Sequence, residues 1–192
     1  MRRRTYYRGT HAKRYEAVRR GKLWKLEHGA VGDFVDTLPV GSRVLDVPVG
    51  TGRFLPIYES AGMDAVGVDV SEDMLAEARG KGTGAGLQAG DIYALDFPNE
   101  HFDAVVCFRI FNWMDLEEAE RAVREMARVC RGRLAMSVTL APEGRTTRSD
   151  QSVHPEAAWA EMLDRAGVKV LEEVPIREPK RHSYRMQVVR PC

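Results

Sequence analysis

One short stretch, residues 43–54, constrains the fold of this chain more than any other. It reads RVLDVPVGTGRF. Val44, Leu45 and Val47 form a nearly continuous apolar run, which is typical of a parallel strand that is buried on both faces. An acid, Asp46, stands near the end of this run. The stretch therefore predicts a central strand of an α/β sheet.

A glycine loop follows the strand and leads into a predicted helix. Gly50 and Gly52 allow the backbone to pass close to a ligand, because no Cβ is in the way. The first turn of a helix also directs unpaired N–H groups back toward such a loop. Strand, loop and helix in this order indicate a nucleotide-type binding site at the end of a first strand.

The glycine loop differs from the dinucleotide-binding pattern, and this difference indicates which ligand it suits. That pattern, G-x-G-x-x-G, has a third glycine where this chain has Leu55. Asp46 would also repel a pyrophosphate, whereas it suits a ligand that carries an ammonium group. The loop thus disfavours a dinucleotide.

Length and composition indicate one globular α/β domain. The chain has 192 residues, of which 44% are hydrophobic and 30% charged. We expect a single domain over 1–192, with an N-terminal helical cap or lid over 1–38 and the sheet core over 39–192. No apolar run is long enough to span a bilayer, and the basic N-terminus lacks the apolar stretch of a signal peptide.

The three cysteines, Cys107, Cys130 and Cys192, are an odd number without metal-ligand spacing. This pattern is typical of a reducing compartment, so we expect a cytoplasmic protein without a metal site.

The charge is distributed unevenly along the chain. Residues 1–28 contain ten Lys/Arg and two Glu, a net +8, so the remainder has 19 basic and 26 acidic side chains, a net −7. Such asymmetry indicates either a basic arm with an anionic partner or a solvated helical face. The spacing of apolar residues over 11–38 predicts two helices separated by Gly21. Trp24 either covers a ligand or docks this segment, and docking is the favoured interpretation.

Strand and helix patterns then alternate to the end of the chain. The predicted strands are 65–70, 87–89, 101–108 and 133–139. The predicted helices are 54–61, one capped by Ser71, one capped by Asp115 that ends at Cys130, and 156–166. Two last strands, 168–176 and 183–189, are joined by six residues, too few for a crossover helix, and must pair antiparallel.

Three positions after the second and third strands are candidates for ligand contacts. Asp69 lies 23 residues beyond Asp46, close to the spacing at which a carboxylate binds a ribose, and it can accept from both hydroxyls. If its carboxylate faces solvent, removing it should leave the stability of the empty protein unchanged. The pair Asp91–Ile92 can recognise adenine, or it forms a plain turn. Met74 either supports the adenine ring or packs in the core.

Residues 43–138 together resemble the class I S-adenosylmethionine-dependent methyltransferases. Their first motif is acid-x-Gly-x-Gly-x-Gly, in which Pro48 here replaces the first glycine and changes the shape of that corner. The segments 102–106 and 124–129 are similar to the small-molecule branch of the family. The usual Lys-Pro-Gly-Gly turn before the fifth strand is replaced by residues 130–133.

This resemblance implies a Rossmann-like, doubly wound, mostly parallel sheet of seven strands in the order 3-2-1-4-5-7-6, with the last strand antiparallel. It implies S-adenosylmethionine as cofactor and S-adenosylhomocysteine as product. The residues expected to bind them are Asp46, Val47, Pro48, Gly50, Thr51, Asp69, Val70, Met74, Asp91, Ile92, Phe108 and Arg109.

The expected reaction is transfer of the methyl group to a small molecule by in-line displacement. The Arg-rich loops 108–114, 140–154 and 177–182, together with the basic arm, favour an anionic acceptor. No catalytic base is singled out among His11, His28, His154, His182, Tyr6, Tyr7 and Tyr15.

Two alternatives remain open. The basic arm would suit an RNA or DNA methyltransferase, although the Asp/Asn-Pro-Pro-aromatic motif is absent and the only Pro-Cys pair is terminal. The second alternative is a protein that binds S-adenosylmethionine without transferring its methyl group. For residues 1–28 themselves, a lid over the cofactor is favoured over a contact with nucleic acid.

Overall fold

The computed structural model describes residues 21–142, 153–177 and 183–192. The chain divides into two compact units, Met1–Asp96 and Phe97–Cys192, and each is described by itself. The predicted helix before Gly21 and the connection 178–182 lie outside the described residues.

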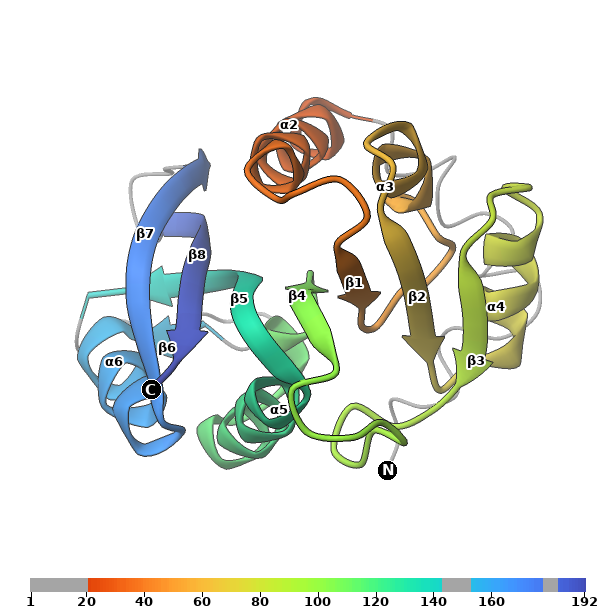
Figure 1. Ribbon diagram of the computed structural model, residues 1–192. Helices are drawn as coiled ribbons and strands as arrows, with labels where there is room; N and C mark the ends of the chain where they lie inside the picture. Colours follow the sequence, from red (N-terminus) through yellow and green to blue (C-terminus); the bar gives the residue numbers. More distant parts are fainter. Residues whose placement is uncertain (1–20, 143–152, 178–182) are drawn as a thin grey trace. The chain divides into compact units, whose positions relative to one another are not determined.

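The first unit is built on three parallel strands in the order β3-β2-β1 (Figure 1). They are β1 (Arg43–Asp46), β2 (Asp64–Asp69) and β3 (Gly86–Ala89). In the register, Asp46 lies opposite Gly67 and Asp69 lies opposite Ala89. The strands thus run in the same direction and present their carboxyl ends, with their acids, at one edge.

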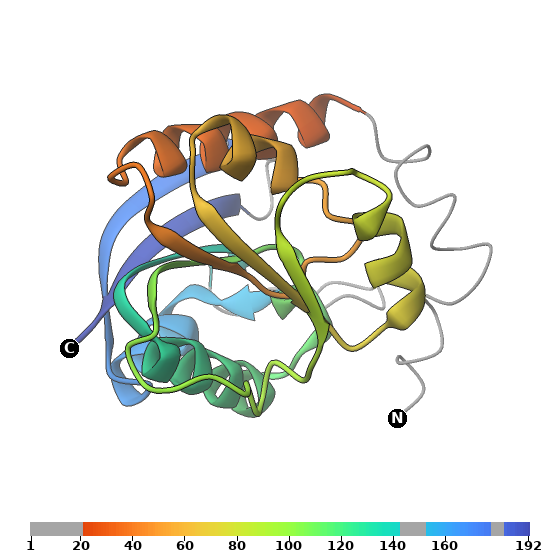
Figure 2. The same ribbon diagram turned by 45° about the vertical axis from the view of Figure 1, so that its right-hand side comes forward.

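Three helices accompany these strands: α2 (Lys22–Asp36), α3 (Leu55–Ser60) and α4 (Glu72–Arg79). In both views α2 lies beside α3 (Figures 1 and 2). Ser71 caps α4 as predicted, since its side chain accepts a hydrogen bond from the Met74 N–H. Tyr58 and Leu55 of α3 and Leu75 of α4 are buried, so these short helices are held by packing more than by their length.

The second unit holds strands in the order β4-β5-β8-β7. They are β4 (Phe102–Cys107), β5 (Cys130–Ala141), β7 (Val168–Arg177) and β8 (Ser183–Pro191). β4 and β5 are parallel. β8 is antiparallel to β7, as the short last connection predicted, and also to β5. The strand orders of the two units correspond to the two halves of the predicted order, and the fold class is confirmed.

One strand was missed. Among the described residues, β6 (His154–Pro155) adds an eighth strand, which pairs parallel with the end of β5. The prediction of seven strands was therefore wrong by this short element. Two residues before a helix carry no alternating pattern, so only the pairing with Leu140 and Ala141 reveals it.

The helical elements of this unit are η1 (Phe111–Trp113), α5 (Leu116–Val129) and α6 (Glu156–Arg165). α5 begins with a capping box formed by Asp115 and Glu118. α6 ends before Gly167, whose φ of +74° is a conformation that suits glycine. No described helix is long and apolar enough to cross a membrane.

The fifth strand begins earlier than predicted, at Cys130 in place of residue 133. Arg131 and Arg133 hid the strand pattern, and Arg131 pairs with Asp103 of β4 at 2.8 Å. The register of β4 and β5 shifts at this point, and a Cβ on Gly132 would collide with the Asp103 backbone. The segment 130–133 is thus the irregular start of a strand, where glycine permits a close approach of two backbones.

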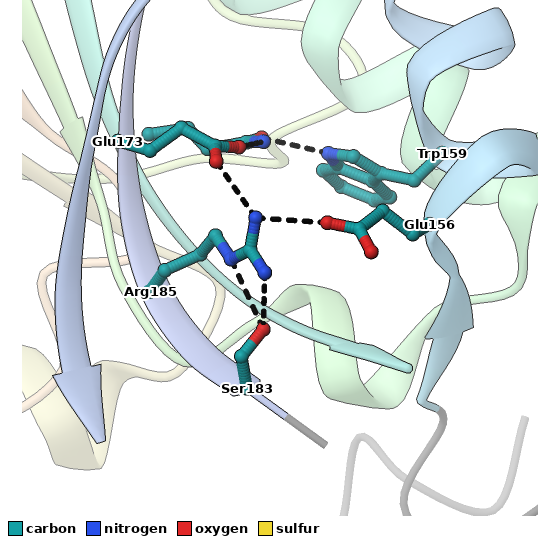
Figure 3. A network of polar contacts seen from close by, with 6 residues as sticks. Glu156, Trp159, Glu173, Ser183 and Arg185 are labelled. Carbon is teal, nitrogen blue, oxygen red and sulfur yellow. Dashed lines mark hydrogen bonds and ion pairs between the residues drawn. The ribbon is translucent and has the colours of Figure 1, made fainter. Parts of the chain in front are cut away.

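A polar network ties α6 to β7 and β8 (Figure 3). The Arg185 guanidinium contacts Glu173 at 2.7 Å and Glu156 at 2.9 Å, and it donates to the Ser183 hydroxyl. Beside it, the Gln187 amide donates to Glu173 at 2.6 Å and accepts from the Trp159 indole N–H at 2.8 Å. The buried indole therefore depends on one side chain for its partner.

Replacing that side chain tests the network. Gln187→Met keeps the length of the side chain but leaves the Trp159 N–H buried without an acceptor, so we expect the free energy of unfolding to fall by about 1–3 kcal/mol. Urea denaturation measures it. The matched control is Gln88→Met, on exposed β3, which should change stability by less than about 0.5 kcal/mol. Equal effects of the two substitutions would contradict the assignment.

Candidate cofactor site

The loop after β1 contains two glycines with different roles. Gly50 and Gly52 both have positive φ, +56° and +71°. A Cβ on Gly52 would lie 2.7 Å from Leu55 Cδ1 and 2.9 Å from Ala78 Cβ, whereas one on Gly50 would meet nothing within 4 Å. Gly52 is therefore required by packing against α3 and α4, and only Gly50 leaves open space beside the backbone. The Val47–Pro48 peptide bond in this loop is cis.

Asp69, at the tip of β2, joins this loop to the start of α4. One carboxylate oxygen accepts from the Gly50 N–H at 2.9 Å and the other from the Ser71 N–H at 2.9 Å. The tips of β1 and β2 are thus connected through a single charged group.

The carboxylate of Asp69 is not solvent-facing in the empty protein. The residue is 7% exposed, and burial raises its pKa, while the N–H groups of Ser71, Gly50 and Val70 act in the opposite direction. The prediction that removal of this carboxylate leaves stability unchanged required it to face solvent, so that prediction does not apply. Spacing alone could not show this, because it does not reveal which backbone groups surround a side chain.

Asp46 lies beneath the same loop and is 2% exposed. Its Oδ2 accepts from the Tyr58 hydroxyl at 3.2 Å. Burial raises the pKa of Asp46 to about 7, and the positive charge of Arg53 and the Tyr58 hydroxyl oppose this shift. The nearby Asp69 carboxylate raises it further. This edge of the sheet therefore holds a carboxylate whose ionised form would be stabilised by a cation.

The other predicted contacts of this unit differ in exposure. Val70 is 53% exposed, whereas Met74 is 4% exposed and packs in the core. Asp91 forms a turn in which its side chain accepts from the Tyr93 N–H and its carbonyl from the Ala94 N–H. The remaining predicted residues, Val47, Thr51 and Ile92, are buried.

Two predicted residues belong to the second unit. Phe108 is buried at the end of β4, and Arg109 follows with φ of +61°. The Arg109 N–H donates to the Ser137 hydroxyl of β5 at 2.8 Å. A non-glycine residue in this conformation is uncommon and occurs most often at functional turns.

Sequence patterns missed how α2 is attached to the loop after β1. Arg53 pairs with the fully buried Glu27 of α2 at 2.6 Å, and its carbonyl lies 3.0 Å from His28 Nε2. His28 Nδ1 lies 2.9 Å from the Trp24 carbonyl, and the two rings stack. The Trp24 ring thus contacts His28 within α2, and its predicted docking role stays a prediction. No pattern marked these contacts, because they join residues 25 and 26 positions apart.

Among the predicted base candidates, the structure describes His28 and His154. His154 is buried, and its Nε2 lies 2.9 Å from the Phe111 carbonyl. Burial lowers the pKa of both histidines. His11, His182 and the tyrosines Tyr6, Tyr7 and Tyr15 lie outside the described residues. Within the described residues there is also no cluster of His, Cys, Asp or Glu that would hold a metal ion.

Part of the chain, including the glycine loop, is similar in sequence to known methyltransferases. The family model described as "Methyltransferase domain" matches residues 45–134. A phosphatidylethanolamine N-methyltransferase of Cereibacter sphaeroides is 47% identical over 97 residues, which are 47% of this chain and 46% of the relative. A demethylmenaquinone methyltransferase of Renibacterium salmoninarum is 39% identical over 99 residues, 52% of this chain and 40% of the relative. The chain thus spans less than half the length of these two relatives.

Solved structures share the fold over a longer range. The magnesium protoporphyrin IX methyltransferase of Synechocystis, solved with bound S-adenosylhomocysteine, is similar with a TM-score of 0.76 at 20% identity, over 97% of both chains. Geranyl diphosphate methyltransferase gives 0.73 at 12% identity, over 88% of this chain and 78% of that one. Together with the glycine loop and the strand-tip acids, the match makes residues 45–134 similar to the methyltransferase domain, and the chain shares the Rossmann-like fold of the magnesium protoporphyrin IX methyltransferase.

Proposed function

We propose that this protein binds S-adenosylmethionine and transfers its methyl group to a small, anionic molecule. The observation that carries the proposal is the Asp69 carboxylate at the tip of β2, bonded to the glycine loop after β1. It brings the loop, an acceptor for hydroxyl groups and the exposed Val70 to one edge of the three-stranded sheet. In parallel α/β sheets, ligands bind at this edge.

The residues of the first unit fit such a ligand. The open space beside Gly50 allows a chain of ligand atoms to approach the loop. A carboxylate has about four acceptor positions, and Gly50, Ser71 and Val70 N–H groups engage Asp69. This leaves about one position for a ribose hydroxyl, fewer than the two expected from the sequence. The exposed side chain of Val70 offers apolar surface to an adjoining ring.

Asp46 supports a ligand with an ammonium group through its charge. A carboxylate with a pKa raised to about 7 by burial gains most from a nearby cation, because little water competes for the interaction. The bound cofactor supplies a sulfonium-activated methyl group, so the chemistry is largely its own. The protein holds the reactants in line and excludes water, which supplies roughly 7–11 kcal/mol in well-oriented reactions.

The acceptor is proposed to be a small molecule. The relatives named above act, by their names, on phosphatidylethanolamine and demethylmenaquinone. The proposed anionic character rests on the Arg-rich loops of the sequence, of which 143–152 and 178–182 lie outside the described residues. No contact of the described residues favours a nucleic acid over a small molecule. A single domain over 1–192, with 1–38 as its cap or lid, is part of the same proposal.

Calorimetry and product analysis test the proposal together. S-adenosylhomocysteine should bind with micromolar affinity, and incubation of labelled S-adenosylmethionine with pooled small-molecule acids should yield a labelled product. Binding of NAD in place of S-adenosylhomocysteine would overturn the assignment of the site. Binding without transfer to any acceptor would favour the non-catalytic alternative.

Asp69→Ala should affect both stability and binding. Removal of the carboxylate leaves the Gly50 and Ser71 N–H groups without their acceptor, so the free energy of unfolding without ligand should fall by about 1–2 kcal/mol. The Kd for S-adenosylhomocysteine should rise by about thirtyfold, equivalent to about 2 kcal/mol. Asp73→Ala, at an exposed position of α4, is the control. An unchanged Kd in a folded Asp69→Ala protein would remove this residue from the site.

Asp46→Asn tests two effects of the buried Asp46 charge: its effect on the stability of the protein and its effect on ligand binding. Because the pKa is about 7 in the folded protein and 3.8 ordinarily, the folded state holds an extra proton between about pH 4 and pH 7. The stability of the natural protein should therefore fall as the pH rises through this window. The Asn variant should lose this dependence and exceed the natural protein at pH 8 by about 1 kcal/mol or more.

The same variant should bind S-adenosylhomocysteine about tenfold or more weakly at pH 8, since the charge that attracts the ammonium group is gone. Asp33→Asn, on the exposed face of α2, should change neither property. Retained affinity together with raised stability would show that the Asp46 charge does not serve the ligand.

A further inference from the structure

A hollow of about 390 Å³ lies between α2, α3 and the residues after α4, within the first unit. We call it the α2–α3 hollow. It is lined by Trp24, Lys25, His28, Arg53, Pro56, Ile57 and Lys81. None of these residues is among those assigned above to the cofactor, so the hollow is a separate feature of the same unit.

The lining is strongly basic. Lys25, Arg53 and Lys81 carry three positive charges, contributed by α2, by the loop before α3 and by the segment after α4. Glu27 forms an ion pair with Arg53. The three basic residues line one concave surface, and basic residues gathered in a concave surface raise the local concentration of anions.

Part of the lining is apolar and rigid. Pro56 and Ile57 line it from α3, and the Trp24 ring stacks on the His28 ring with centroids 3.4 Å apart. The two ring nitrogens of His28 lie 2.9 Å and 3.0 Å from the carbonyl oxygens of Trp24 and Arg53. The aromatic wall is therefore preorganised, which reduces the entropy that a ligand loses when it binds.

The size and chemistry indicate the class of ligand. A volume of about 390 Å³ lies in the range of small-molecule sites, which combine apolar walls with a few charged groups. Lysine is a common phosphate ligand, and arginine and lysine both favour oxyanions. We propose that the α2–α3 hollow binds a small phosphate monoester that carries an apolar or aromatic ring, at a site distinct from the one for the methyl donor.

The test uses the full chain and three probes in calorimetry: 2-naphthyl phosphate, 2-naphthol and inorganic phosphate. We expect saturable binding of 2-naphthyl phosphate, and weaker binding of the two partial probes, because each lacks one of the two contacts. Lys25→Gln and Lys81→Gln should each weaken binding of the full probe by about fivefold or more, the effect of about 1 kcal/mol. Lys22→Gln, on the same helix but outside the lining, should leave it unchanged.

Affinity for S-adenosylhomocysteine should be unchanged in Lys81→Gln, whose residue lies outside the proposed lid 1–38, and this separates the inference from the proposed function. The proposal is overturned if 2-naphthyl phosphate gives no saturable heat at millimolar concentration, or if Lys22→Gln weakens it as much as Lys25→Gln and Lys81→Gln do. It is also overturned if the protein does not bind 2-naphthyl phosphate but binds vesicles of phosphatidylcholine and phosphatidic acid, and Lys25→Gln weakens that vesicle binding. The hollow would then be a contact for a lipid surface.

Discussion

The hydrogen bonds of the Asp69 carboxylate organise the first unit. They connect the glycine loop after β1 with the start of α4, so that two strand tips and a helix share one charged group. Because the residue is almost fully buried, these bonds act with little competition from water. The loop that would hold a ligand is therefore shaped before any ligand arrives. Preorganisation of this kind reduces the cost of binding.

Asp46 illustrates the conflict between stability and function at the same edge. Burial of the Asp46 carboxylate beneath the loop, with the Asp69 carboxylate nearby, disfavours its ionised form and raises its pKa to about 7. Tyr58 and Arg53 oppose this shift without removing it. A cation bound above the loop would compensate the charge, so in the proposed function the residue that weakens the protein without ligand would strengthen the complex.

Arg53 links this edge to the helix α2. Its ion pair with Glu27 and the contact of its carbonyl with His28 attach α2 to the end of the glycine loop. Arg53 and His28 also line the α2–α3 hollow. The loop is thus positioned by Asp69 from the sheet and by Glu27 and His28 from the helix. A ligand in the hollow would contact a residue that belongs to this framework.

The sequence alone determined the order of strands and helices along the chain and the antiparallel last pair, because apolar periodicity, glycines and caps such as Ser71 are local signals. The family entered as a resemblance of residues 43–138. It did not determine β6 or the early start of β5, since these strands exist only through their pairing. Tertiary structure also decided that Gly52 serves packing against Ala78 and that Asp69 is buried. The contacts of Glu27 and His28 with Arg53 likewise join distant parts of the chain. Burial and long-range contacts depend on which surfaces meet, and no local pattern in the chain encodes that directly.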